Sequence, residues 1–243
     1  MSRIAFVTTC KGRLHHLKQT LPLLLAAGPD QIVVVDYACP DGTADWVKEN
    51  YPQIDVVRVT DDPGWCLPRA RNQGASQVDS GWICFIDADI KIDPSWVVWM
   101  QSSLEAGYFY RAAPIEGARD FETWGTVICD KAAFDRIGGY DEAFRGWGGE
   151  DDELYFQLQK QGAQQESEYP SRFVAPISHD DDERVTFHQV KSKELQSRIN
   201  QYYRVLKAHL MEELGSELSL ETRRSMMMQI TEAFRKNPDC AGK

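Results

Sequence analysis

The chain has 243 residues, of which 42% are hydrophobic, enough for one large domain or for a domain with an appendage. Its formal net charge of −10 argues against a general polyanion binder, because nucleic-acid affinity depends on many lysine and arginine contacts to phosphate. No apolar run approaches the ~20 residues of a membrane span, so any membrane contact is expected to be peripheral.

The N-terminal part alternates between short apolar strands and helices. Strands are predicted at 4–8, 31–36, 54–59 and 82–86, separated by helices that begin at about residues 14, 41 and 68. The run QIVVVD at 31–36 lacks polar alternation, as is typical of parallel strands covered on both faces. Repeated βα units of this length predict an α/β fold with a mostly parallel central sheet and right-handed crossovers.

The pattern changes after residue 95. Further strands are predicted at 107–115, 123–130 and 173–177, and a helix is predicted between 150 and 162. From about residue 187 the chain is polar with apolar residues at helical spacing, and a second helix is expected at 219–235. We therefore predict a main domain at 1–187 and a C-terminal helical extension at 188–243.

The sequence has six cysteines and no CxxC pair. They stand at positions 10, 39, 66, 84, 129 and 240, most of them in apolar surroundings. This usage predicts reduced core thiols of a cytoplasmic protein rather than a secreted disulfide framework. The N-terminus runs from Met-Ser-Arg directly into IAFVTTC, which is too short and too β-like for a signal peptide, so a cytoplasmic location is expected.

Carboxylates follow three of the predicted parallel strands. Asp36 ends the second strand, Asp61 and Asp62 follow the third, and Asp87 and Asp89 follow the fourth in the sequence FIDAD. In open α/β sheets, ligands bind beyond the carboxyl ends of the strands. These acids are therefore expected along one edge of the sheet, where a ligand would bind.

Asp87 and Asp89 are separated by a single residue. In an extended segment such residues face the same way, about 6.5–7 Å apart. Two ionised carboxylates there repel each other unless a cation lies nearby, and magnesium or manganese favours carboxylate oxygen, water and substrate phosphate. The pattern indicates a divalent metal that bridges Asp89 to a phosphorylated ligand. The alternative is that both acids cap a turn in solvent.

Three further residues have two readings each. His179, in APISHDDDE after the last predicted strand, is either a metal ligand, since imidazole suits manganese better than magnesium, or a structural or exposed histidine. Asp36 either caps its loop or accepts hydrogen bonds from a base or a ribose. Arg71 either pairs with a surface acid or neutralises a phosphate. Local sequence leaves these alternatives open.

The segment GWGGEDDE at 146–153 combines glycines, a tryptophan and acids. Glycines permit close backbone approach to a ligand, and Trp147 supplies a face for stacking. Acids in a first helical turn complement the helix dipole, which is the structural alternative, but a tryptophan flanked by glycines adds nothing to capping. One of these carboxylates is therefore a candidate to accept a proton from an attacking hydroxyl.

Together these residues resemble the GT-A fold glycosyltransferases that use nucleotide sugars. VVVDYACPDGTADWV, ARNQGA, FIDAD and IGGYDEAF are similar to successive signatures of the large inverting family that builds bacterial polysaccharides. GWGGEDDE followed by a downstream histidine resembles more narrowly the β-1,4-galactosyltransferases and the chondroitin-polymerase type transferases. The resemblance covers about residues 3–185 and implies a Rossmann-like GT-A fold for transfer from nucleotide-diphospho-sugars.

The resemblance also implies roles for single residues. Donor-binding residues are implied at Thr9, Lys11, Arg13, Asp36, Arg71, Asp87, Trp147, Gly148 and Gly149. Asp89 and His179 are implied to bind manganese or magnesium, Glu150 to orient the acceptor, and Asp151 to act as the base. Two positions depart from the galactosyltransferase pattern, because Pro176 stands where a further metal ligand is usual and Thr9 stands where proline is usual.

The implied activity is metal-dependent, inverting transfer of a hexose or N-acetylhexosamine from a UDP-sugar to a hydroxyl of a glycan or lipid-linked acceptor, in bacterial surface polysaccharide synthesis. A homodimer and peripheral contact with the inner face of the plasma membrane are left open, and nucleic acid is not expected as a partner. A nucleotidyltransferase, one alternative, would need a glycine-rich and basic first loop, whereas TTCKGRLHH has one glycine. A non-catalytic nucleotide-sugar or glycan-binding module would tolerate loss of the acids, and every acid is present.

Overall fold

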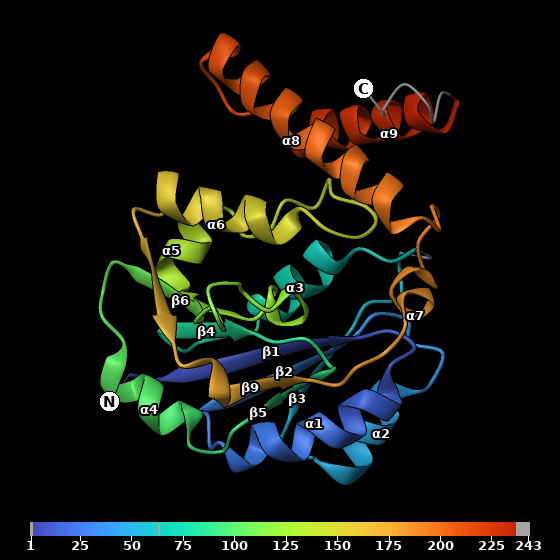
Figure 1. Ribbon diagram of the computed structural model, residues 1–243. Coiled ribbons are helices and arrows are strands. Elements are labelled where there is room, and N and C mark those ends of the chain that lie inside the picture. The colour runs from blue at the N-terminus through green and yellow to red at the C-terminus, as the bar shows by residue number, and fades with distance from the viewer. Residues whose placement is uncertain (1, 63, 237–243) are drawn as a thin grey trace. The chain divides into compact units, whose positions relative to one another are not determined.

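The computed structural model describes residues 2–62 and 64–236 (Figure 1). The chain forms two compact units. The first comprises Met1–Pro63, Ala70–Gly139 and Tyr155–Ser178, and the second comprises Gly64–Arg69, Tyr140–Leu154 and His179–Lys243. The segment at 140–154 therefore belongs to the same unit as the C-terminal helices, and our domain boundary at residue 187 stays a prediction.

The first unit is built on a seven-stranded sheet with the order β3-β2-β1-β4-β7-β6-β8. Its strands are β1 (Ile4–Cys10), β2 (Gln31–Asp36), β3 (Asp55–Arg58), β4 (Trp82–Phe85), β6 (Tyr108–Ala112), β7 (Val127–Asp130) and β8 (Gln165–Tyr169). The strands β3, β2, β1 and β4 are parallel, β7 is antiparallel to β4 and to β6, and β6 pairs with β8 in parallel. The predicted α/β class with a mostly parallel sheet is confirmed.

Helices cover both faces of this sheet (Figure 1). On one face lie α1 (Leu14–Ala26), α2 (Thr43–Asn50) and α4 (Trp96–Ser103), and on the other lie α3 (Leu67–Ala75) and α5 (Lys131–Arg136). The α1 leucines at 14, 17, 21 and 24 are buried against Ile4 and Phe6 of β1. Their helical spacing gives α1 one apolar stripe, and that stripe faces the sheet.

The close contact between α3 and the sheet depends on Gly74. A Cβ atom there would lie 2.4 Å from Cγ1 of Val7 and 2.8 Å from Cγ2 of Val35. We expect Gly74→Ala to lower the free energy of unfolding by about 1–2 kcal/mol, since overpacking costs about 1–3 kcal/mol and better helix propensity offsets at most about 1 kcal/mol. Urea unfolding measures this. In the control Gly81→Ala the new Cβ meets nothing within 4 Å, and an equal loss in both variants would contradict the packing argument.

Two strands differ from the predicted arrangement. The predicted last strand exists as β9 (Val174–Pro176), but it pairs antiparallel with β5 (Ile90–Ile92) in a separate two-stranded sheet. The edge strand β8, with the sequence QESEY, was not expected because it has no apolar run. Its glutamates instead pair with arginines, Glu166 with Arg111 at 3.2 Å and Glu168 with Arg119 at 2.9 Å. Short 3₁₀ turns at Phe121–Thr123 and Ser171–Phe173 complete this unit.

The second unit contains α7 (Asp181–Val185), α8 (Lys193–Leu214), α9 (Leu220–Lys236) and the first turn of α6 (Glu150–Lys160). Its buried core comprises Ala143, Phe144, Ile199, Tyr203, Met227 and Ile230. The helix α8 is capped by Gly215, whose φ of +61° lies in the left-handed region that suits glycine. The two predicted C-terminal helices are thus present, and Met227 packs in the core of this unit.

The five described cysteines, at 10, 39, 66, 84 and 129, are reduced thiols, and Cys240 lies outside the described residues. Cys84 and Cys129 are fully buried, which raises the pKa of each thiol and makes it inert. Cys39 is only half-buried. Within 2–62 and 64–236, none of the helices combines the length and apolar character that crossing a bilayer requires.

Candidate functional site

The carboxyl ends of β1, β2 and β4 meet at one edge of the sheet in the first unit, since these strands are parallel. From the loop after β1, the Lys11 ammonium donates to the Tyr37 carbonyl oxygen at 3.0 Å. From the same loop, Nη1 of Arg13 lies 2.7 Å from Oδ2 of Asp89, which follows β4. Basic side chains that follow β1 and an acidic side chain that follows β4 therefore lie together at this edge.

The two acids of FIDAD lie in a turn rather than an extended segment. The Ile90 N–H donates to the Asp87 carbonyl oxygen at 3.1 Å, which closes the turn. Each carboxylate has its own arginine, since Asp87 pairs with Arg71 at 2.9 Å and Asp89 pairs with Arg13. The premise that both acids project alike from an extended strand is wrong, and the chain's own cations balance their charges.

For both Arg71 and Asp36 the structure shows the structural alternative, since Arg71 pairs with an acid and Asp36 caps its loop. Arg71 is almost fully buried, and its acid partner Asp87 is partly exposed. Both oxygens of Asp36 accept backbone N–H bonds, from Cys39 at 2.7 Å and from Ala44 at 2.8 Å, so Asp36 caps the loop that leads into α2. Thr9, beside them in β1, is buried. Asp36 thus shapes the loop after β2, whatever else it binds.

In the second unit, the loop at 146–149 requires its glycines. Gly146 and Gly149 have φ values of +89° and +91°. A Cβ atom on Gly146 would lie 2.6 Å from Oε1 of Gln196, and one on Gly149 would lie 3.3 Å from Cβ of Asn200. A larger residue at either position would therefore be strained in its backbone conformation, and at Gly146 it would also displace the Gln196 side chain of α8. Gly148, with φ of +85°, completes the left-handed run.

Helix α8 holds this loop through its side chains. Gln196 accepts a hydrogen bond from the Trp147 N–H, and Asn200 donates to the carbonyl oxygens of Trp147 and Gly148. The ammonium of Lys193 lies 4.4 Å from the centre of the Trp147 ring. These residues occupy one side of α8 at helical spacing, but no local pattern links them to a loop about fifty residues earlier, and sequence reasoning missed them.

The predicted acceptor and base residues stand in the first turn of α6. Glu150 is buried, Asp151 is partly exposed, and the Tyr140 hydroxyl lies 3.4 Å from Oδ1 of Asp151. The next acid, Asp152, lies 3.5 Å from Arg204 of α8. The acids of this turn therefore have different surroundings. A single helix-capping role shared by all of them would not predict this difference.

His179 begins the final segment of the second unit. Its side chain is 5% exposed, its Nδ1 atom lies 3.4 Å from Oε2 of Glu183, and it also contacts the Asp180 carbonyl oxygen at 3.1 Å. These contacts fix the orientation of the ring. Ile177, which precedes His179 by two residues in the chain, belongs to the first unit. Its N–H donates to the Asp89 carbonyl oxygen at 2.7 Å.

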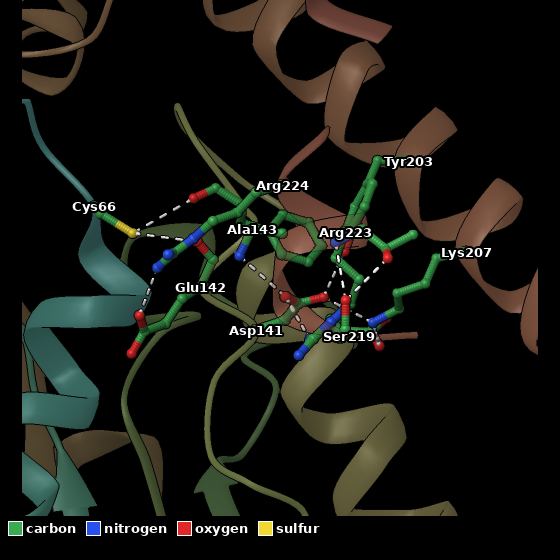
Figure 2. A network of polar contacts seen from close by, with 12 residues as sticks. Cys66, Asp141, Glu142, Ala143, Tyr203, Lys207, Ser219, Arg223 and Arg224 are labelled. Atoms are coloured by element: carbon green, nitrogen blue, oxygen red, sulfur yellow. Dashed lines mark hydrogen bonds and ion pairs between the residues drawn. The ribbon is translucent and has the colours of Figure 1, made fainter. Parts of the chain in front are cut away.

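A buried charge network joins the elements of the second unit (Figure 2). Asp141 lies 3.0 Å from the Lys207 ammonium and 2.7 Å from Arg223, and it accepts a hydrogen bond from the Tyr203 hydroxyl at 2.8 Å. Lys207 also pairs with Glu153 of α6. Burial would raise the pKa of Asp141, but Lys207 and Arg223 outweigh it and hold the pKa below its ordinary value. The network ties α8 and α9 to the turn that carries Asp151.

Two protein families match the sequence. Residues 5–129, about half of the chain, match glycosyl transferase family 2. Residues 113–208 match the N-terminal domain of galactosyltransferase, so the two matches together span most of the described chain. No curated protein sequence matches the chain.

Solved glycosyltransferase structures share the fold. S. aureus TarS 1-349 in complex with UDP-GlcNAc has a TM-score of 0.65 at 13% identity, and the match covers 97% of this chain and 73% of the TarS 1-349 chain. The catalytic domain of Drosophila β1,4-galactosyltransferase 7 in complex with xylobiose has a TM-score of 0.57 at 15% identity, and the match covers 81% of this chain and 79% of that domain. The mannosyltransferase PcManGT from Pyrobaculum calidifontis in complex with GDP-Man and Mn2+ has a TM-score of 0.59 at 14% identity, and the match covers 100% of this chain and 76% of that chain.

At these identities the structural likeness establishes the fold alone, and the family match establishes the membership. Both agree with the mostly parallel sheet and with the charged strand ends described above. The chain belongs to glycosyl transferase family 2 and is a glycosyltransferase with the GT-A fold, as its motifs predict.

Proposed function

We propose that this glycosyltransferase takes a hexose or N-acetylhexosamine from a UDP-sugar and transfers it, with inversion, to a hydroxyl of a glycan or lipid-linked acceptor. Bacterial surface polysaccharide synthesis in the cytoplasm, at the inner face of the plasma membrane, is the setting we infer. Structures of the same fold hold UDP-GlcNAc in TarS, GDP-Man and Mn2+ in PcManGT, and xylobiose in galactosyltransferase 7. These ligands support a nucleotide-sugar donor and a glycan acceptor for this chain.

The observation that carries the proposal is the charge arrangement at the sheet edge. Lys11, Arg13 and Arg71 lie there with Asp87 and Asp89, all within the first unit. A diphosphate needs cationic partners, and a divalent ion needs carboxylates. Both kinds of group are present at the carboxyl ends of the strands, where open α/β sheets bind ligands. A protein with a net charge of −10 thus offers cations locally to an anionic donor.

Asp89 and His179 are the residues we propose to hold a manganese or magnesium ion. The donor set fits manganese, which accepts both carboxylate and imidazole. A carboxylate offers about four lone-pair sites, so the bond from Arg13 to Asp89 leaves room for a further contact. A metal-binding histidine typically has its second ring nitrogen held by a carboxylate or carbonyl, and Nδ1 of His179 has both around it. A bound ion would neutralise charge on the nucleoside diphosphate as it leaves.

Asp151 is the residue that we propose as the base. It accepts the proton of the acceptor hydroxyl, which then attacks the anomeric carbon on the face opposite the leaving group, so one displacement inverts the configuration. Glu150 orients the acceptor. Trp147 and the backbone of Gly148 and Gly149 contact the sugar and the β-phosphate, and Thr9 and Asp36 lie at the nucleotide.

Incubation with a panel of nucleotide sugars, manganese and glycan or glycolipid acceptors tests this proposal. We expect release of UDP together with a β-linked product from an α-linked donor, and loss of both when EDTA removes the metal. Release of pyrophosphate from a nucleoside triphosphate would instead favour a nucleotidyltransferase. Binding of nucleotide sugars without turnover across the panel would favour a non-catalytic module. Product with retained configuration would contradict the single displacement.

A further inference from the structure

Two cysteines that are distant in the sequence are neighbours beside the loop after β1. Cys10 ends β1, and Cys39 lies in the loop between β2 and α2. The Thr43 hydroxyl oxygen lies 3.2 Å from Sγ of Cys10 and 3.1 Å from Sγ of Cys39. The two thiols therefore share one hydroxyl contact, and each shifts the pKa of the other. Both cysteines belong to the first unit, so their proximity is a property of one compact body.

The two thiols differ in exposure and in acidity. Cys10 is 1% exposed, whereas Cys39 is half-buried. The interaction with Cys10 lowers the pKa of Cys39 to about 5, with further help from Thr43 and the Gly12 N–H against the opposing effect of burial. The same interaction, together with burial, raises the pKa of Cys10. An acidic, half-buried thiol thus lies beside a fully buried thiol, which is the arrangement of a reactive and a resolving cysteine.

We propose that Cys39 and Cys10 form a dithiol site that hydrogen peroxide oxidises reversibly to a disulfide, and that the disulfide weakens donor binding by the loop after β1. The oxidation is independent of the proposed function, whereas its effect on donor binding rests on it. The Cys39 thiolate attacks one peroxide oxygen, the O–O bond breaks, and hydroxide leaves. The Cys10 sulfur then attacks the sulfenic acid at Cys39, the S–O bond breaks as the S–S bond forms, and the Cys10 proton leaves with the oxygen as water. Two thiols lose two electrons, and peroxide is reduced to water.

The link to donor binding is the Gly12 N–H, which donates to Sγ of Cys39 at 3.1 Å. Gly12 stands between Lys11 and Arg13, the two basic residues of this loop. Formation of the S–S bond moves the Cys39 sulfur toward Cys10 and away from the Gly12 N–H. The loop then loses the acceptor that holds Gly12, so Lys11 and Arg13 are expected to lose their positions.

Peptide mapping of the peroxide-treated wild-type protein under non-reducing conditions tests the site directly. We expect a Cys10–Cys39 disulfide that dithiothreitol reverses, while Cys84 and Cys129 stay reduced. In Cys10→Ser, the sulfenic acid at Cys39 should accumulate and react with dimedone, and the buried control Cys129→Ser should still form the bridge. The proposal is overturned if both thiols persist at peroxide levels that oxidise a free cysteine peptide, or if Cys39 is oxidised without bridging to Cys10.

Thermal shift with UDP and manganese tests the consequence. Oxidation should reduce the shift of the wild-type protein by at least half, dithiothreitol should restore it, and Cys39→Ser should be insensitive to peroxide. A mapped disulfide with an unchanged shift would overturn the coupling to donor binding. If the reduced protein shows no shift with UDP, the proposed function fails, while the mapping experiment still decides the dithiol site.

Discussion

Replacing Asp151 with asparagine is expected to lower the rate of sugar transfer by a factor of about 10²–10⁴, the usual contribution of a general base. Asparagine has nearly the same shape but cannot accept the proton of the acceptor hydroxyl. Because the change leaves the arginines and carboxylates of the first unit in place, binding of the UDP-sugar should be unchanged. Single-turnover transfer measures the rate, and calorimetric titration measures donor affinity.

Asp152→Asn is the matched control for this variant. It removes the same charge from the same first turn of α6, where acids complement the helix dipole. Its carboxylate is 42% exposed and pairs with Arg204 at 3.5 Å, so we expect little change in rate. Unchanged turnover in Asp151→Asn, or equal losses in the two variants, would contradict the assignment of Asp151 as the base.

Replacing Lys207 with methionine should lower the free energy of unfolding by about 3–5 kcal/mol, the typical cost of removing one partner from a buried ion pair. The Lys207 side chain is 5% exposed and lies between Asp141 and Glu153. Methionine has similar length and no charge, so the loss of stability measures the cost of leaving Asp141 and Glu153 without their ammonium partner. Lys207→Arg should recover part of the stability, since it restores the charge.

An exposed lysine in the same unit provides the comparison. Lys236 pairs with Glu232 on the surface of α9, where both side chains are more than 60% exposed, and Lys236→Met should lower the free energy of unfolding by less than about 0.5 kcal/mol.

The pKa of folded Asp141 lies below its ordinary value of 3.8. The stability that the ionised Asp141 contributes is therefore present above pH 3.8 and is lost as the pH falls through the folded-state pKa. Equal urea midpoints for wild type and Lys207→Met at pH 7 would refute the network.

The strands of the central sheet are largely predictable because burial on both faces leaves an unbroken apolar run, as in Val33–Val35 of β2. Strand β8 shows the limit of that signal. It is a polar edge strand whose glutamates pair with arginines from elsewhere in the chain, so its sequence resembles a loop. Likewise, β5 has only three residues, too few for any periodicity.

The candidate site is predictable in its residue types but not in its contacts. Acids at strand ends indicate a ligand edge, yet the turn at Asp87 and its pairing with Arg71 depend on tertiary structure. The sequence predicts only that Cys10 and Cys39 are reduced core thiols, because nothing local shows that they come together at Thr43. For the same reason, the hydrogen bond from Asn200 to the loop at 146–149 could not be predicted from the sequence.

Calorimetric titration of UDP into the wild-type protein and into Asp89→Ala, with and without manganese, tests the central claim most directly. The control Asp79→Ala removes an acid that also pairs with an arginine, Arg3 at 3.0 Å, but at the residues that precede β1 and β4. We predict manganese-dependent binding of UDP by the wild-type protein and by Asp79→Ala, and none by Asp89→Ala. Equal affinity for UDP with and without manganese, or undiminished binding by Asp89→Ala, would contradict a metal-held donor at this edge of the sheet.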